Sequence, residues 1–255
     1  MKIIRILALL VLVVLPYSSV LSHFSPYLTA HSFPDFVFAS LAYGVLIVAL
    51  SRFISAKNTR FPGFGLPALG VLIGPPLMLG PPELGENLLN RVTEEHFRFG
   101  LLMVATVLLG VSGGLLLRKI KGHPLLWGLL IVSVVLQLWD NYSSYHFSEE
   151  MNHWIQSGRN PAGFITDYPF HQAVRTFGRC LVYVLVPAVS WILWKKGTLK
   201  KWIFVTLTVF CSAGLVFFFL FNFQGYAFYF PFMIPAVALA PAYWLGIALT
   251  GSHQG

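Results

Sequence analysis

The chain has 255 residues, of which 56% are hydrophobic, 16% aromatic and only 10% charged, and its formal net charge is +8. This composition excludes an ordinary water-soluble globular domain. It also argues against nucleic-acid binding, because the basic residues occur in short tracts beside apolar segments, as in the cytoplasmic loops of membrane proteins.

The apolar segments predict an all-α, polytopic integral membrane protein with about eight transmembrane helices in a single helical domain, 1–255. A span needs about 20 mostly apolar residues, and neither an internal repeat nor a long linker divides the chain. In chain order, the predicted spans are 3–21, 34–54, 66–80, 98–117, 124–139, 179–194, 202–222 and 228–249. An extracytoplasmic loop, 140–178, is long enough to be functional or to carry its own helix.

The basic residues predict the orientation of these spans. All eight lysines and four of the nine arginines flank the spans at alternate ends, and these flanks share one side only if 66–80 also crosses. The positive-inside rule then predicts a bacterial inner-membrane protein with both termini in the cytoplasm. The alternative is that the first segment is a signal peptide cleaved near Ser18 to Ser22, which leaves seven spans.

The carboxylates all fall on the opposite, outer side of this predicted topology. They are Asp35, Glu83, Glu86, Glu94, Glu95, Asp140, Glu149, Glu150 and Asp167. The asymmetry predicts that any chemistry takes place at the outer face, where three stretches combine carboxylates with histidine or arginine.

The stretch 139–157 is the densest of the three. At about 100° per residue, His146, Glu149, Glu150 and His153 fall on one helical stripe that Tyr142 continues toward the membrane. Imidazoles and carboxylates are ligands for a divalent metal such as zinc or iron, which makes His146, Glu150 and His153 candidate metal ligands. Acid–base catalysis by Glu149 and Glu150, with Tyr142 contacting the substrate, is a second interpretation. A solvated helix face with local pairs is the third.

The second stretch, 93–98, opens a predicted span. Glu94 and Glu95 lie where the positive end of the helix dipole favours carboxylates, which is a sufficient structural account of these two. It does not explain His96 and Arg98. We therefore hypothesise that Glu94, Glu95 and His96 are catalytic and that Arg98 contacts the substrate.

The third stretch, 167–179, places His171, Arg175 and Arg179 on roughly one helical face. Arginines that enter a membrane from its outer side are costly unless paired, and we expect carboxylates of the other two stretches as partners. His171 is a candidate catalytic residue, and both arginines are candidates for binding an anionic headgroup. The alternative is that they snorkel toward lipid phosphates.

Together these stretches favour a membrane-embedded enzyme with a His/Glu/Arg site on its extracytoplasmic face, with or without a divalent metal cofactor, that acts on a lipid or lipid-linked substrate. Membrane lipids are its expected partners, with other membrane subunits as a further option. Two alternatives stay open. One is a non-catalytic subunit or assembly factor of a larger complex. The other is a transporter or channel, although the predicted span centres contain almost no ionisable residues.

Overall fold

The computed structural model describes residues 2–17, 33–55, 63–79, 91–159, 169–222 and 234–251, and these contain helices but no strand. The prediction of an all-α protein is therefore confirmed for this part of the chain. The elements are α1 (Lys2–Val14), η1 (Leu15–Tyr17), α4 (Phe33–Ile54), η2 (Gly63–Ala68), α5 (Leu69–Met78), α6 (Val92–Ile120), α7 (Pro124–Gln156), α9 (Pro169–Lys195), α10 (Lys201–Asn222) and α11 (Pro235–Gly251).

Four helical segments are long and apolar enough to cross a membrane, which is consistent with an integral membrane protein. They are α4, α6, α7 and the Phe177–Lys195 part of α9. The other four predicted spans coincide with shorter apolar helices in α1, η2–α5, α10 and α11. Each predicted span thus corresponds to a helical segment, while the crossing of all eight stays a prediction.

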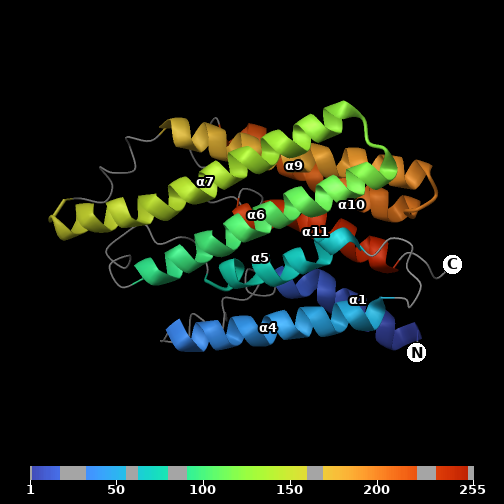
Figure 1. Cartoon of the computed structure of the whole chain (residues 1–255), viewed down its shortest axis with the longest axis horizontal. Helices are drawn as coiled ribbons and strands as arrows, with labels where there is room; N and C mark the ends of the chain where they lie inside the picture. Colours follow the sequence, from blue (N-terminus) through green and yellow to red (C-terminus); the bar gives the residue numbers. More distant parts are fainter. Residues whose placement is uncertain are drawn as a thin grey trace.

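The helices form an elongated bundle in which they run along a common direction (Figure 1). α7 packs between α6 and α9, and α10 packs on α9. α11 contacts α9, α5 and η2, and nearly all of its side chains are buried. A helix that is apolar on every side belongs in the interior of a bundle. Alanines dominate its first half, so neighbouring backbones can approach it closely.

α1 is part of this bundle, because α11 donates two hydrogen bonds to its last residues. The Tyr243 hydroxyl donates to the Leu12 carbonyl at 2.6 Å, and the Trp244 ring nitrogen donates to the Val13 carbonyl at 3.2 Å. Leu12 itself is fully buried. The alternative of cleavage near 18–22 falls on residues outside the described ranges, and it stays an alternative.

The short segment 66–80 is held by contacts with α4. The Tyr43 hydroxyl donates to the Gly70 carbonyl at 2.8 Å, and the Tyr43 ring packs directly on Gly74, where a Cβ would collide with it. Pro75 and Pro76 lie inside α5 without ending it, and both are buried. The segment is therefore an interior element of the bundle.

The outer loop predicted at 140–178 carries helix at both of its ends, in agreement with the helical patterns predicted on 139–157 and 167–179. α7 continues from Pro124 to Gln156 over 33 residues, or about 50 Å. α9 begins at Pro169, as expected for a proline in a first helical turn. The first polar residues after the predicted span, Asp140 and Asn141, have partners on α9 and α6, whereas Glu150 and His153 are exposed.

Gly178 allows α7 and α9 to approach closely. A Cβ at this position would lie 2.9 Å from the Leu136 Cβ and 3.4 Å from the Gln137 Cγ, and the Gly178 carbonyl accepts a 3.0 Å hydrogen bond from Ser133.

Replacing Gly178 with alanine should therefore destabilise the protein by about 1–3 kcal/mol, since the two helices must move apart. Thermal unfolding in detergent measures this. Gly128→Ala is the matched control, because nothing lies within 4 Å of the added carbon and alanine is the better helix former. Equal melting temperatures for the two variants would contradict the close approach.

Candidate functional site

Polar side chains are buried along the face of α7 that packs against α6 and α9. In apolar surroundings a polar group must find its partner on a neighbouring helix, so such a row marks the inner face of a membrane bundle. We call these residues, together with their partners on α6 and α9, the polar seam. Its members are Ser133, Gln137, Asp140, Asn141, Ser144 and Ser148 on α7, Thr106 on α6 and Arg179 on α9.

Hydrogen bonds link the uncharged members of the polar seam across helices. Asn141 Nδ2 on α7 donates to Thr106 Oγ1 on α6 at 3.2 Å. Gln137 Nε2 donates to Ser133 Oγ at 3.0 Å, and Ser133 in turn donates to a carbonyl of α9. These bonds fix the lateral position of α7 between its two neighbours.

The centre of the polar seam is a buried ion pair between α7 and α9. Arg179 Nη2 donates to Asp140 Oδ2 at 2.6 Å, and the two side chains are only 7% and 3% exposed. Ser144 Oγ lies 3.5 Å from the other carboxylate oxygen. The expectation that an arginine of 167–179 pairs with a carboxylate of another stretch is confirmed here.

This ion pair lies at the outer ends of the predicted spans 124–139 and 179–194. Asp140 lies about 24 Å along α7 from Pro124, and Arg179 lies about 24 Å along α9 from Lys195. A hydrocarbon layer is about 30 Å thick, so the pair falls within it if the lysine-rich end marks one boundary. The pair would then lie about 6 Å from the outer boundary, which leaves the expectation that the span centres carry almost no ionisable residues as a prediction.

A second group of polar residues lies farther out, between α6 and α7. Glu149 stands between two imidazoles: His96 Nε2 is 3.5 Å from its Oε1, and His146 Nδ1 is 3.4 Å from its Oε2. The rings of His96 and Tyr145 are stacked at 4.1 Å and 15°. We call His96, Tyr145, His146 and Glu149 the outer cluster.

The outer cluster is accessible from outside the bundle. Its ionisable side chains are 22% (His96), 44% (His146) and 45% (Glu149) exposed. The stacking on Tyr145 restricts rotation of the His96 ring, while Tyr142 contacts His146 edge-on at 4.5 Å. The cluster therefore combines oriented imidazoles with an open approach.

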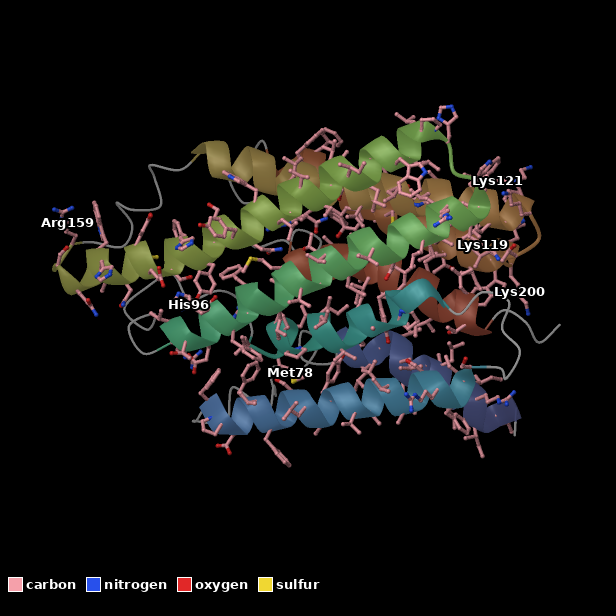
Figure 2. All side chains as sticks on the ribbon, in the orientation of Figure 1. Met78, His96, Lys119, Lys121, Arg159 and Lys200 are labelled. Carbon is pink, nitrogen blue, oxygen red and sulfur yellow. The ribbon has the colours of Figure 1, made fainter. Side chains whose placement is uncertain are left out.

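The outer cluster lies at the level expected for lipid headgroups. Glu149 is about 13 Å beyond Asp140 along α7, and so about 37 Å from the start of the helix. Figure 2 shows His96 toward the end of the bundle opposite Lys119, Lys121 and Lys200. A bilayer is about 40–45 Å thick with its headgroups, so the cluster would stand just beyond the hydrocarbon if the lysine-rich end marks the opposite boundary.

The other ionisable candidates on α6 are less open. Glu95 and Arg98 form an intrahelical ion pair at 3.2 Å, with side chains only 3% and 6% exposed. Glu94 is partly buried in the first turn of the helix. The catalytic roles predicted for Glu94 and Glu95, and the substrate contact predicted for Arg98, stay predictions.

The stripe predicted on 139–157 lies on one continuous helix, but most of it faces outward. Glu150, His153 and Tyr142 are exposed. The buried seam residues of α7 lie roughly 170° around the helix from this stripe, at about 100° per residue. Glu149 meets a residue of another stretch, His96 on α6, and His146 contacts Glu149 from the same helix.

The predicted metal ligands do not form a metal site in the described part of the chain. Among those residues, no three His, Cys, Asp or Glu side chains are placed to hold a metal ion. The predicted set His146, Glu150 and His153 thus gains no support. His171 and Arg175 lie on α9, but their side chains fall outside what the structure describes.

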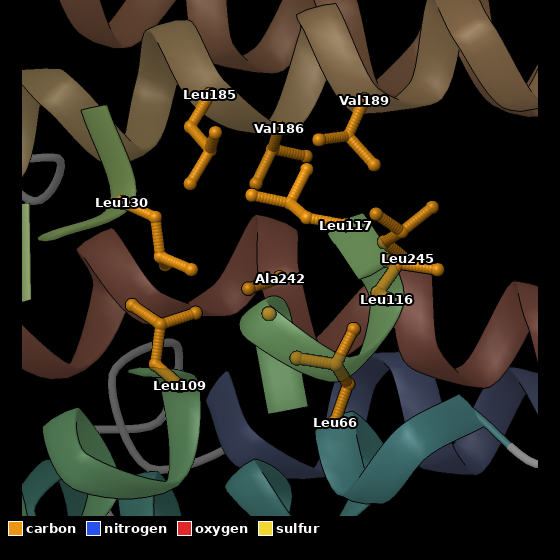
Figure 3. A pocket seen from close by; sticks show the side chains of 11 residues that line it. Leu66, Leu109, Leu116, Leu117, Leu130, Leu185, Val186, Val189, Ala242 and Leu245 are labelled. Atoms are coloured by element: carbon orange, nitrogen blue, oxygen red, sulfur yellow. The ribbon is translucent and has the colours of Figure 1, made fainter. Parts of the chain in front are cut away.

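Toward the lysine-rich end, the interior of the bundle is apolar. A small cavity of about 30 Å³ lies there between α6, α7, α9 and α11, and Leu109, Leu130 and Val186 are among its lining residues (Figure 3). It could hold about one water molecule, but its walls offer no polar partners. The buried charged residues of the described ranges, which are Glu95, Arg98, Asp140 and Arg179, all lie on the outer side of this apolar region.

Sequence reasoning missed several residues that the structure brings together. These residues carry no charge and lie in or next to apolar segments, so the pattern of titratable residues did not indicate them. They are Thr106, Ser133, Gln137, Asn141 and Ser144. Their signal was the recurrence of small polar residues every three or four positions along α7, which is typical of helix–helix interfaces in membranes. Tyr145 had no signal of its own.

No protein-family model, curated protein or solved structure matches the chain.

Proposed function

We propose that this chain is a multi-pass membrane enzyme whose outer cluster performs acid–base chemistry on a lipid or lipid-linked substrate. All eight helical segments cross the bilayer in this proposal, with the lysine-rich end in the cytoplasm of a bacterial cell. The observation that carries it is the approach of His96 and His146 to opposite oxygens of Glu149.

The chemistry follows from the geometry of the two imidazoles. Glu149 faces Nε2 of His96 and Nδ1 of His146, so each ring keeps its other nitrogen for proton exchange with a substrate. A carboxylate that orients an imidazole and stabilises its protonated form is the arrangement of many general bases. With two such rings, one can accept a proton from an attacking hydroxyl or water while the other donates a proton to the leaving group.

The position of the cluster supports a lipid or lipid-linked substrate. It lies at the expected headgroup level, beside exposed aromatic and aliphatic side chains that suit contact with acyl chains. Ester and phosphoester bonds of a lipid lie at this depth, and a water-soluble substrate would have no need of a site there. The buried polar seam then serves to hold α6, α7 and α9 in the register that the cluster requires.

The test is lipid conversion by the purified protein. Proteoliposomes made with a bacterial total lipid extract are incubated at neutral pH and sampled for mass spectrometry of lipids. Wild type should convert at least one lipid species with time, and His146→Gln should not. Unchanged lipids in both preparations would contradict an enzyme of this substrate class and favour the non-catalytic subunit.

A second candidate function is ion-coupled transport, which the Asp140–Arg179 pair favours. Coupled transporters place ionisable residues within the membrane, where their protonation follows the transport cycle. Proton flux into liposomes that depends on Asp140 but not on His146 would support transport over catalysis.

A further inference from the structure

Two turns at the lysine-rich end of the bundle are tied together by a hydrogen bond. Lys196, in the turn between α9 and α10, donates from Nζ to the Ile120 carbonyl at the end of α6, at 2.5 Å. Both turns are tight, because Lys121 and Gly197 adopt positive φ values of 51° and 69°. The side chains of the two turns therefore project from fixed backbone positions.

The two tied turns carry seven exposed cations, which we call the basic platform. Its residues are Arg118, Lys119, Lys121, Lys195, Lys196, Lys200 and Lys201. There is no Asp or Glu between Phe99 and Leu138, or between Cys180 and Asn222. Figure 2 shows Lys119, Lys121 and Lys200 close together at this end of the molecule. So many like charges repel each other unless anions lie among them.

Two helix N-termini add to the positive potential of the basic platform. α7 and α10 both begin here, at Pro124 and Lys201, and neither has an acidic residue in its first turn. The partial positive charge of a helix N-terminus attracts anions, phosphate above all.

Tryptophans lie beside the basic platform. Lys195 Nζ stands 4.8 Å from the ring centres of both Trp191 and Trp194, and Trp194 stacks on Phe204 at 5.2 Å. Trp191 and Trp202 are 47% and 61% exposed. Tryptophans favour the membrane interface, where they contact the glycerol region of lipids.

We propose that the basic platform binds an anionic phospholipid that carries two phosphates, one at each turn, with its acyl chains against the tryptophans of α9 and α10. Basic pockets between membrane helices on the cytoplasmic side suit headgroups of this kind. A lipid with a single phosphate would satisfy only one of the two turns. The inference rests on the membrane insertion in the proposed function, but not on catalysis.

The experiment is native mass spectrometry of the full chain in detergent with added tetraoleoyl cardiolipin, and with phosphatidylglycerol as the single-phosphate comparison. Wild type should retain cardiolipin preferentially. Lys121→Gln combined with Lys200→Gln, one exposed lysine from each turn, should weaken that binding roughly 30-fold, at about 1 kcal/mol for each lysine. The control is Arg5→Gln with Arg52→Gln, which removes two cations from α1 and α4 and should leave cardiolipin binding unchanged.

Equal weakening by the two double variants, or equal retention of the two lipids, would overturn the proposal, because general attraction to a positive surface would then suffice. Alkaline carbonate extraction of membranes separates this result from a failure of the proposed function. A chain released by carbonate refutes membrane insertion itself, whereas a chain that stays inserted without lipid preference refutes only the basic platform.

Discussion

Replacing Asp140 with asparagine should destabilise the protein by about 3–5 kcal/mol, because the variant leaves the Arg179 guanidinium charged and buried without its carboxylate. Asparagine has nearly the shape of aspartate, so the loss reports charge and not a cavity. The Arg179→Gln variant should be destabilised for the same reason, with a buried carboxylate left behind. Thermal or denaturant unfolding in detergent measures both effects.

The double variant and an exposed control make this prediction specific. Asp140→Asn with Arg179→Gln removes both charges and should be more stable than either single variant, since no uncompensated charge remains. Glu150→Gln changes an exposed carboxylate on the same helix and should alter stability by no more than about 0.5 kcal/mol. Additive losses in the double variant would show that the two residues do not interact.

Replacing either histidine of the outer cluster with glutamine should lower lipid conversion about 100- to 10,000-fold, the usual contribution of a general acid or base. Glutamine keeps a hydrogen-bonding amide but cannot exchange a proton near neutral pH. If His96 and His146 act in one reaction as base and acid, the double variant should lose little more than either single variant. Initial rates in proteoliposomes give these ratios.

The free energy of unfolding of the two histidine variants is the control for their loss of activity. Both histidines are partly exposed, so their replacement should change the free energy of unfolding far less than the Asp140 variant does. Independent, multiplicative losses of rate would indicate that the two imidazoles do not act in a common step. Full activity in the His96 variant would exclude α6 from the site.

The positions of the helices could be predicted from the sequence, and so could the helical continuation past Trp139, but the pairing that supports it could not. Hydropathy located each apolar segment, and the helical stripe on 139–157 indicated that the helix runs on. Asp140 and Arg179 neutralise each other, and this makes helix continuation through apolar surroundings possible. A hydropathy average is taken over neighbouring residues, so it includes only one partner of such a pair. It therefore scores each charge as if that charge were unpaired in the membrane.

The candidate site was predicted in part. The three stretches were recognised by their titratable residues, and 139–157 meets both of the others, through His96 and Glu149 and through Asp140 and Arg179. The residues of α7 that lie at its helix interfaces were not predicted, because polar residues occur on both sides of this helix. The charged stripe is mostly exposed, and the uncharged side packs against α6 and α9. The choice between the two faces depends on where α6 and α9 lie, which the sequence of α7 alone does not contain.

The central claim is that Glu149, and not the neighbouring carboxylate, organises the reactive site. The most direct test is the rate of lipid conversion by Glu149→Gln beside Glu150→Gln, in matched proteoliposomes with equal amounts of folded protein. Glu149→Gln should lose at least about 100-fold in rate, because neither imidazole keeps its carboxylate, whereas Glu150→Gln should convert lipid like the wild type. Equal rates for the two variants would contradict the proposed site.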